Sequence, residues 1–220
     1  MLNDCKSMKK ILLIGANSDI AKSLAKESGF EFINISSKDS DFNILEKSTF
    51  PKFNAIDGLV YFPGTINLKP FSNLKEKDFQ QDYEINVLGL INSLQVYQNA
   101  LNPNASIVTI SSIAASFGMP FHTSIAMCKA SVEALTKSLA AEWSPKVRLN
   151  CIAPSLISTK LSQRLINSEL KKEKIKEKHP LKIIGETNDI SNMISFLLSE
   201  KSKWITGQII RIDGGLSNIR

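Results

Sequence analysis

The side chains best suited to chemistry lie in the stretch from residue 111 to residue 130. Ser112 supplies a hydroxyl, Lys129 an ammonium group and His122 an imidazole. Imidazole titrates near neutral pH, as a proton donor should. These three groups are therefore the first candidates for polarising a substrate and moving a proton.

The placement of His122 depends on where a helix begins. A helix that starts early enough would put His122, Ile125 and Lys129 on one face, because they are three and seven residues apart. The alternative is a loop histidine beside a helix whose N-cap is Thr123 or Ser124.

Apolar runs alternate with longer amphipathic stretches, which is typical of strand–crossover–strand units and a parallel sheet. We predict strands at about 10–14, 31–35, 56–61, 106–110, 147–152 and 208–212. We predict helices near 18–28, 75–100, 123–142 and 188–199. The run 171–178 mixes Glu with Lys at helical spacing, as a solvent-facing helix would.

A glycine follows the first predicted strand. Gly15 comes directly after Ile11–Ile14, and a helical pattern begins near Asp19. Free N–H groups at a helix start can bind a pyrophosphate, and a glycine before them avoids a collision with the phosphates. The charge of Asp19 would oppose a pyrophosphate, so we expect its side chain to point away. The alternative is an ordinary strand-to-helix turn.

The second predicted strand ends in Ser36, Ser37 and Lys38. Two hydroxyls and an ammonium can bind a 2′-phosphate, which favours NADP(H) over NAD(H). Asp39 and Asp41 follow closely, and either could instead bind the ribose hydroxyls, as an acid does in NAD-binding proteins.

Six segments, in this order, resemble those of the short-chain dehydrogenase/reductase family. They are the turn 14–21, Gly64 within 59–64, the segment 86–89, Ser112 with Lys129, the segment 150–159, and 205–208 with 213–215. The resemblance implies an α/β fold with a Rossmann-type doubly wound parallel sheet, as a single domain over 1–220. Too few residues separate Ile35 from Asp57 for a further helix and strand. We therefore predict that the second crossover helix is missing and that the third strand is a stub near 40–43.

The resemblance also implies roles for individual residues. In the family the lysine binds the nicotinamide ribose, the serine polarises the carbonyl and the asparagine holds a water in a proton relay. These roles fall on Lys129, Ser112 and Asn86. The cofactor-binding residues implied are Gly15, Asn17, Ser18, Asp19, Ile20, Ser36, Ser37, Lys38, Asn43, Ile44, Gly64, Lys129, Pro154, Ile157 and Thr159.

One position departs from the family. The catalytic tyrosine precedes the lysine by four residues, and Ile125 stands there instead. Isoleucine has no proton to donate, and a positioned general acid contributes about 10²–10⁴ in rate. His122 is one substitute, and Lys129, or a water that it orders, is another.

Two functions follow from these residues. The first is an NADP-dependent oxidoreductase that moves hydride between NADP(H) and a carbonyl or alcohol substrate with a non-standard proton donor, under a lid at about 157–182. Retention of Ser112, Asn86, Lys129 and Thr159 favours it. The second is a catalytically inactive NADP(H)-binding sensor or assembly protein, which Ile125 favours.

Composition narrows the remaining classes. A length of 220 residues fits one domain. The net charge of +6 comes from scattered lysines with only four arginines, so nucleic-acid binding is not expected. The apolar run 11–14 is too short for a signal or a membrane span. Three cysteines without metal-ligand spacing indicate a reduced cytoplasmic protein without a metal. Family resemblance implies a homodimer or homotetramer.

Overall fold

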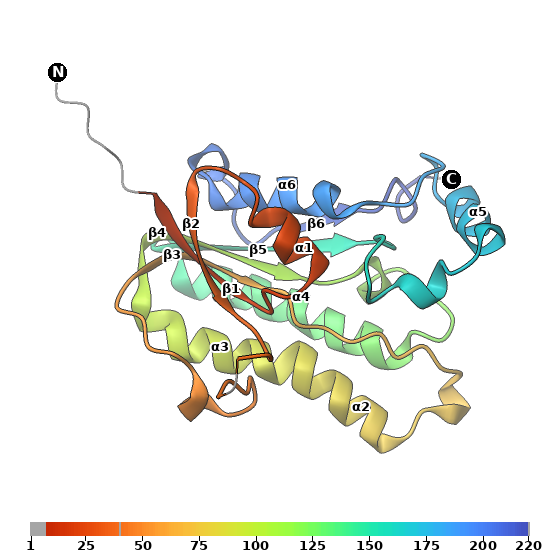
Figure 1. The fold of residues 1–220 in the computed structure, drawn as a ribbon, viewed down its shortest axis with the longest axis horizontal. Helices are drawn as coiled ribbons and strands as arrows, with labels where there is room; N and C mark the ends of the chain where they lie inside the picture. The colour runs from red at the N-terminus through yellow and green to blue at the C-terminus, as the bar shows by residue number, and fades with distance from the viewer. Residues whose placement is uncertain (1–7, 40, 220) are drawn as a thin grey trace.

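Six parallel strands form one sheet in the computed structural model, which describes residues 8–39 and 41–219 (Figure 1). The order across the sheet is β2-β1-β3-β4-β5-β6. The strands are β1 Lys9–Ile14, β2 Phe30–Ile35, β3 Ile56–Tyr61, β4 Leu101–Ile110, β5 Val147–Pro154 and β6 Ile209–Ile212. The predicted parallel α/β sheet is confirmed, and the largest shift in a strand boundary is that β4 begins at Leu101.

The helices connect consecutive strands or follow them. They are α1 Asp19–Leu24, α2 Glu76–Tyr83, α3 Gly89–Tyr97, α4 Thr123–Trp143, α5 Glu169–Lys178 and α6 Thr187–Leu198. A π-helical segment, Glu84–Leu88, joins α2 to α3, so the predicted helix 75–100 is a single rod with an irregular centre. Short 3₁₀ turns occur at Lys47–Thr49, Phe71–Asn73, Gln98–Ala100, Ile113–Ala115, Gln163–Leu165 and Glu200–Ser202. No helix in residues 8–39 and 41–219 is long and apolar enough to cross a bilayer.

The sheet is covered on both faces. Helices α1 and α6 lie on one side and α2, α3 and α4 on the other (Figure 1). Along β1, Ile11 and Leu13 belong to the core on the α1–α6 side, whereas Leu12 and Ile14 belong to the core on the α3–α4 side. Alternate side chains of a strand point to opposite faces, so a strand buried on both faces is a continuous apolar run.

Among its described residues, the connection between β2 and β3 holds only a 3₁₀ turn, which confirms that the second crossover helix is missing. The predicted stub of a third strand is wrong for residues 41–43, which form no strand, while Ser40 lies outside the described residues. The physical reason is local. The N–H of Asn43 donates to Thr49 Oγ1 at 3.0 Å and the Thr49 hydroxyl donates to Asn43 O at 3.0 Å, so this backbone closes on itself instead of pairing with β2.

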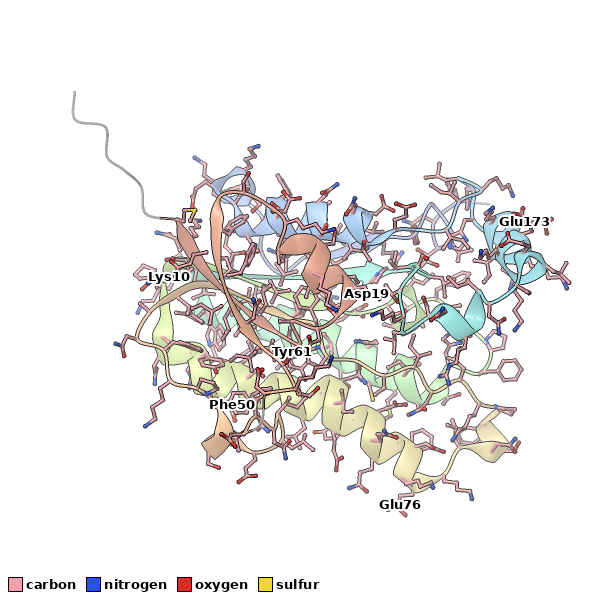
Figure 2. The ribbon with its side chains drawn as sticks, in the orientation of Figure 1. Lys10, Asp19, Phe50, Tyr61, Glu76 and Glu173 are labelled. Atoms are coloured by element: carbon pink, nitrogen blue, oxygen red, sulfur yellow. The ribbon has the colours of Figure 1, made fainter. Side chains whose placement is uncertain are left out.

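Tyr61, at the end of β3, fixes the irregular centre of the α2–α3 rod. Its hydroxyl donates to the carbonyl of Ile85 at 2.6 Å, within the π-helical segment. Burial holds the pKa of Tyr61 far above its usual value, so the phenol remains a donor. Figure 2 shows Tyr61 between the sheet and this rod. A π-helical turn disrupts the regular ladder and is common at functional sites. It presents Asn86.

Gly89, just beyond this turn, should not tolerate a side chain. A Cβ there would lie 2.6 Å from Ile44 Cδ1 and would also meet the Tyr61 hydroxyl. We expect Gly89→Ala to lower the free energy of unfolding by roughly 1–3 kcal/mol in urea titration. Gly118→Ala is the control, because a Cβ at Gly118 meets no heavy atom within 4 Å. Equal stabilities of the two variants would contradict this packing.

Candidate active site

The turn after β1 needs its glycine. Gly15 has φ +80°, and a Cβ there would lie 2.8 Å from Pro63 Cδ in the segment after β3. Its N–H and that of Ala16 both donate to the carbonyl of Ile35, at 2.8 and 3.1 Å. The turn therefore joins the carboxyl ends of β1, β2 and β3. The chain reverses direction across the sheet between β1 and β3, where open α/β sheets bind ligands.

Helix α1 begins within this turn. Ser18 is its N-cap, and the Ser18 Oγ accepts from Ala21 N at 3.1 Å. Asp19 is the first helical residue, and its Oδ2 accepts from the backbone N–H of Lys160 at 2.6 Å (Figure 2 labels Asp19). The carboxylate is thus engaged by the segment that follows Thr159. Asn17 lies in the turn, and Ile20 is the second residue of α1.

The end of β2 forms a closed loop. Asp39 Oδ2 accepts from Ser36 N at 2.7 Å, and Lys38 N donates to Ser36 Oγ at 3.3 Å. The side chains of Ser37 and Lys38 are exposed. This loop therefore offers a hydroxyl, an ammonium and, beside them, the carboxylate of Asp39.

Asn43 and Ile44 face different surroundings. Asn43 is exposed, and its Oδ1 accepts from Leu45 N at 3.0 Å. Ile44 packs against the start of α3 at Gly89, and its carbonyl accepts from Asn92 Nδ2 at 3.1 Å. Their predicted contact with an adenine stays a prediction.

The predicted reacting groups converge at the carboxyl ends of β3 and β4. A Cβ added to Gly64 would lie 3.3 Å from Asn86 Oδ1 and 3.5 Å from Lys129 Nζ. Lys129 Nζ donates to the carbonyl of Ile110 at 2.9 Å, two residues before Ser112. Four separate parts of the chain therefore bring Gly64, Asn86, Ser112 and Lys129 to one edge of the sheet.

His122 lies just outside α4. The helix begins at Thr123, so His122 is its N-cap residue. The alternative prediction, an N-cap at Thr123 or Ser124, is therefore wrong. The His122 Nδ1 lies 2.7 Å from the carbonyl of Pro120 and donates to it. The ring's Nε2 is then the nitrogen that can accept or release a proton. Ile125, one turn later, is only 5% exposed.

The ammonium of Lys129 is electrostatically costly. Burial lowers the pKa of Lys129 to about 8, an effect opposed by charge on Cys151, Cys128 and Asp82. Burial raises the pKa of both thiols to about 11, so both are neutral at pH 8. The third opposing group, Asp82, is a carboxyl group on helix α2.

Three residues of this region were missed by the sequence analysis: Thr65, Asn67 and Asp82. The side chain of Asp82 is fully buried, and its Oδ1 accepts from Asn67 Nδ2 at 2.9 Å and from the Thr65 hydroxyl. A signal existed. Asp78, Asp82 and Asn86 recur every four residues in an amphipathic helix, so they share one face, and all three are buried.

The segment after β5 folds back on itself. Pro154 ends β5, Ile157 forms an isolated parallel bridge with Gly185, and Thr159 Oγ1 lies 3.2 Å from Ser162 Oγ. The hydroxyl of Thr159 thus already has a partner, and its predicted cofactor contact stays a prediction.

Helix α5 is tied to this segment by a buried histidine. His179 Nδ1 donates to the carbonyl of Ile175 at 2.8 Å, so its Nε2 accepts from the Ser155 hydroxyl at 2.8 Å. Helix α5 itself buries none of its residues, and Glu173 lies on its outer surface (Figure 2). It is the solvent-facing helix that the Lys–Glu pattern predicts.

Replacing Lys129 should stabilise the protein. The pKa of Lys129 is about 8 in the folded protein, whereas the ordinary value for lysine is 10.5. The unfolded chain therefore binds more protons between these values, and stability rises with pH in that window. At pH 7 we expect Lys129→Met to raise the free energy of unfolding by roughly 2 kcal/mol, after allowing for the lost hydrogen bond to Ile110. The gain should shrink as the pH rises from 8 toward 10.5 in urea titrations.

The exposed Lys137 on the same helix provides the control, since Lys137→Met should show no such pH-dependent gain. Destabilisation by Lys129→Met at pH 7 would show that the ammonium is better compensated than its burial implies.

Known proteins match this fold and sequence. A family model described as enoyl-(acyl carrier protein) reductase matches residues 11–217. The 3-oxoacyl-[acyl-carrier-protein] reductase of Thermotoga maritima is 32% identical over 187 residues, which cover 84% of this chain and 75% of that protein.

Solved structures agree. A short chain dehydrogenase family protein from Francisella tularensis has a TM-score of 0.87 at 23% identity, covering 96% of this chain and 99% of that one. ElxO with NADP bound has a TM-score of 0.84 at 25% identity, covering 95% and 98%. Together with the strand order and the match over residues 11–217, these findings show that the chain belongs to the short-chain dehydrogenase/reductase family of oxidoreductases.

Proposed function

We propose that this chain transfers hydride between NADP(H) and a carbonyl or alcohol substrate. The observation that carries the proposal is that Asn86 Oδ1 and Lys129 Nζ meet at Gly64, while Lys129 Nζ also binds the carbonyl of Ile110, two residues before Ser112. A dinucleotide-binding protein without chemistry has little need for a serine hydroxyl at that point. The Thermotoga relative is named a reductase, which supports the same reaction class.

The residues present fit a nicotinamide dinucleotide. A side chain at Gly15 would fill the space in front of Pro63. A side chain at Gly64 would fill the space in front of Asn86 and Lys129. Asn86 Oδ1 is buried and has no hydrogen-bond partner among the described residues. When bound, the dinucleotide supplies the hydride. The residues that would hold it are Gly15, Ser18, Ser37, Lys38, Gly64, Lys129 and Thr159.

The residues of the chain divide the remaining work. Ser112 Oγ donates to the substrate oxygen and polarises the carbonyl. The Lys129 ammonium binds the nicotinamide ribose and, by its charge, favours an anionic substrate oxygen. His122 Nε2 delivers the proton that completes the alcohol, in place of the tyrosine that Ile125 replaces. The imidazole regains its proton from solvent, since His122 is only half-buried.

The second candidate is a cofactor-binding sensor or assembly protein without chemistry. The buried, apolar Ile125 beside the reacting groups favours it. The two candidates differ in whether bound NADPH is oxidised in the presence of a carbonyl compound.

Substitution of His122 and Ile125 separates these candidates. We expect slow NADPH oxidation with simple carbonyls in the unmodified protein, and His122→Ala should lower kcat about 10²-fold or more with unchanged NADPH affinity. Adding Ile125→Tyr to His122→Ala should restore activity, because Lys129 lies one helical turn away and lowers the phenol's pKa.

Ile125→Phe is the matched control, with the same ring and no hydroxyl, and it should restore nothing. If none of these proteins oxidises NADPH on a broad carbonyl panel although all bind it, the enzyme proposal is rejected and the binding role remains.

We propose a preference for NADP(H) over NAD(H), from the exposed ammonium of Lys38 beside Ser37. ElxO, similar over 95% of this chain, is known with NADP bound. In fluorescence titrations NADPH should bind more tightly than NADH, and Lys38→Ala should weaken NADPH alone by about tenfold. Asp39→Asn should strengthen NADPH, since it removes a carboxylate at the same loop. If the unmodified protein binds NADH more tightly than NADPH, and Asp39→Asn loses that preference, the cofactor assignment is reversed to NAD(H).

A further inference from the structure

Asp82, in the last turn of α2, is a buried acid that hydride transfer does not use. Its side chain has no exposed surface, and its Oδ1 accepts from Thr65 and Asn67. Its Oδ2 is buried and has no hydrogen-bond partner among the described residues. A buried carboxylate is expensive unless an opposite charge or hydrogen bonds compensate it. Half of this carboxylate is without such a bond.

Asp82 is connected to the reacting groups through one asparagine. Asn86 Nδ2 donates to the Asp82 carbonyl at 2.8 Å and to Thr65 Oγ1 at 2.9 Å. The other side-chain atom of Asn86, Oδ1, lies with Lys129 Nζ around Gly64. Thr65, Asp82 and Asn86 therefore form one polar cluster, and Lys129 lies at its edge.

The titratable groups around Lys129 come from three elements. Helix α4 contributes Cys128, β5 contributes Cys151 and α2 contributes Asp82. Glu133, one turn further along α4, is held by the Ser111 hydroxyl at 2.8 Å. Both thiols are neutral in the pH range in which Lys129 titrates, because burial raises their pKa to about 11. Asp82 is the carboxyl group of this set, it lies on α2, which packs against α4, and its charge raises the pKa of Lys129.

We propose that Asp82 is a positioning residue of the cofactor site, whose buried carboxylate keeps Lys129 in its ammonium form through the cluster with Thr65 and Asn86. The proposal rests on the proposed function in one respect, that Lys129 binds the nicotinamide ribose. Beyond the N–H that it donates to Ile110, the Lys129 ammonium has two N–H bonds and a charge for ribose oxygens, whereas the neutral amine has one N–H fewer and no charge. Asp82 thereby extends the pH range over which the cofactor is held.

The test is the pH dependence of NADPH affinity between pH 6 and 10 for the unmodified protein, Asp82→Asn and Glu84→Gln. The affinity of the unmodified protein should fall as the pH rises through about 8. In Asp82→Asn the same fall should come about one pH unit earlier, which makes NADPH roughly fivefold to tenfold weaker at pH 8 and unchanged at pH 6. Glu84→Gln removes the same charge from the neighbouring turn and should leave the curve unchanged.

A merely structural Asp82 gives a different result. Asp82→Asn would then weaken NADPH equally at every pH, or not at all, and either result overturns the proposal. If Asp82→Asn does not fold by circular dichroism, Asp82→Val takes its place, because an apolar side chain suits this buried position and also removes the charge. The expected shift is the same.

A second readout needs no cofactor. In protein with ¹³C-labelled lysines, the Lys129 signal is assigned by its absence in Lys129→Met, and its titration midpoint is measured directly by NMR. The midpoint should be lower in Asp82→Asn than in Glu84→Gln, and equal midpoints would overturn the proposal. If the unmodified protein binds no NADPH at any pH, the proposed function fails, while the NMR midpoints still decide the role of Asp82.

Discussion

The hydrogen bond from Lys129 Nζ to the carbonyl of Ile110 joins helix α4 to the carboxyl end of β4. A buried ammonium destabilises a fold unless its surroundings supply acceptors and an opposite charge. The surroundings of Lys129 meet that demand only in part: the acceptor at the end of β4 and the charge of Asp82 oppose the cost of burial, and the pKa of Lys129 is still lowered to about 8. A side chain at Gly64 would lie within 3.5 Å of both Asn86 Oδ1 and Lys129 Nζ, and glycine leaves that space unfilled.

The irregular turn is itself held in place from the sheet. The Tyr61 hydroxyl satisfies the carbonyl of Ile85, and Gly89 leaves room for that hydroxyl and for Ile44. A regular α-helix over the same residues would place Asn86 elsewhere, because a π-helical turn adds one residue to the ladder. The site is therefore built on rigid elements, with its irregularity confined to one turn that a buried tyrosine fixes.

Two contacts between distant parts of the chain define the other side of the site. Asp19 accepts from the backbone of Lys160, and His179 accepts from the Ser155 hydroxyl. The first joins the turn after β1 to the segment after β5, and the second joins that segment to the end of α5. The segment after β5 is thereby connected to the turn after β1 by hydrogen bonds and by Ile157, which belongs to the same buried apolar cluster as Ile11 and Leu13.

The sequence by itself determined the layered α/β fold, because strands such as β1 are apolar on both faces and cannot be stable outside a covered parallel sheet. The sequence also predicted a turn that needs a glycine at position 15. The structure agrees, since φ +80° and the approach of Pro63 admit no side chain there. Only the structure decided that residues 41–43 form no strand, that α4 begins one residue after His122, and that the charge of Asp82 acts on Lys129. The first depends on the hydrogen bonds between Asn43 and Thr49, and the last depends on the packing of α2 against α4, which no local pattern of residues encodes.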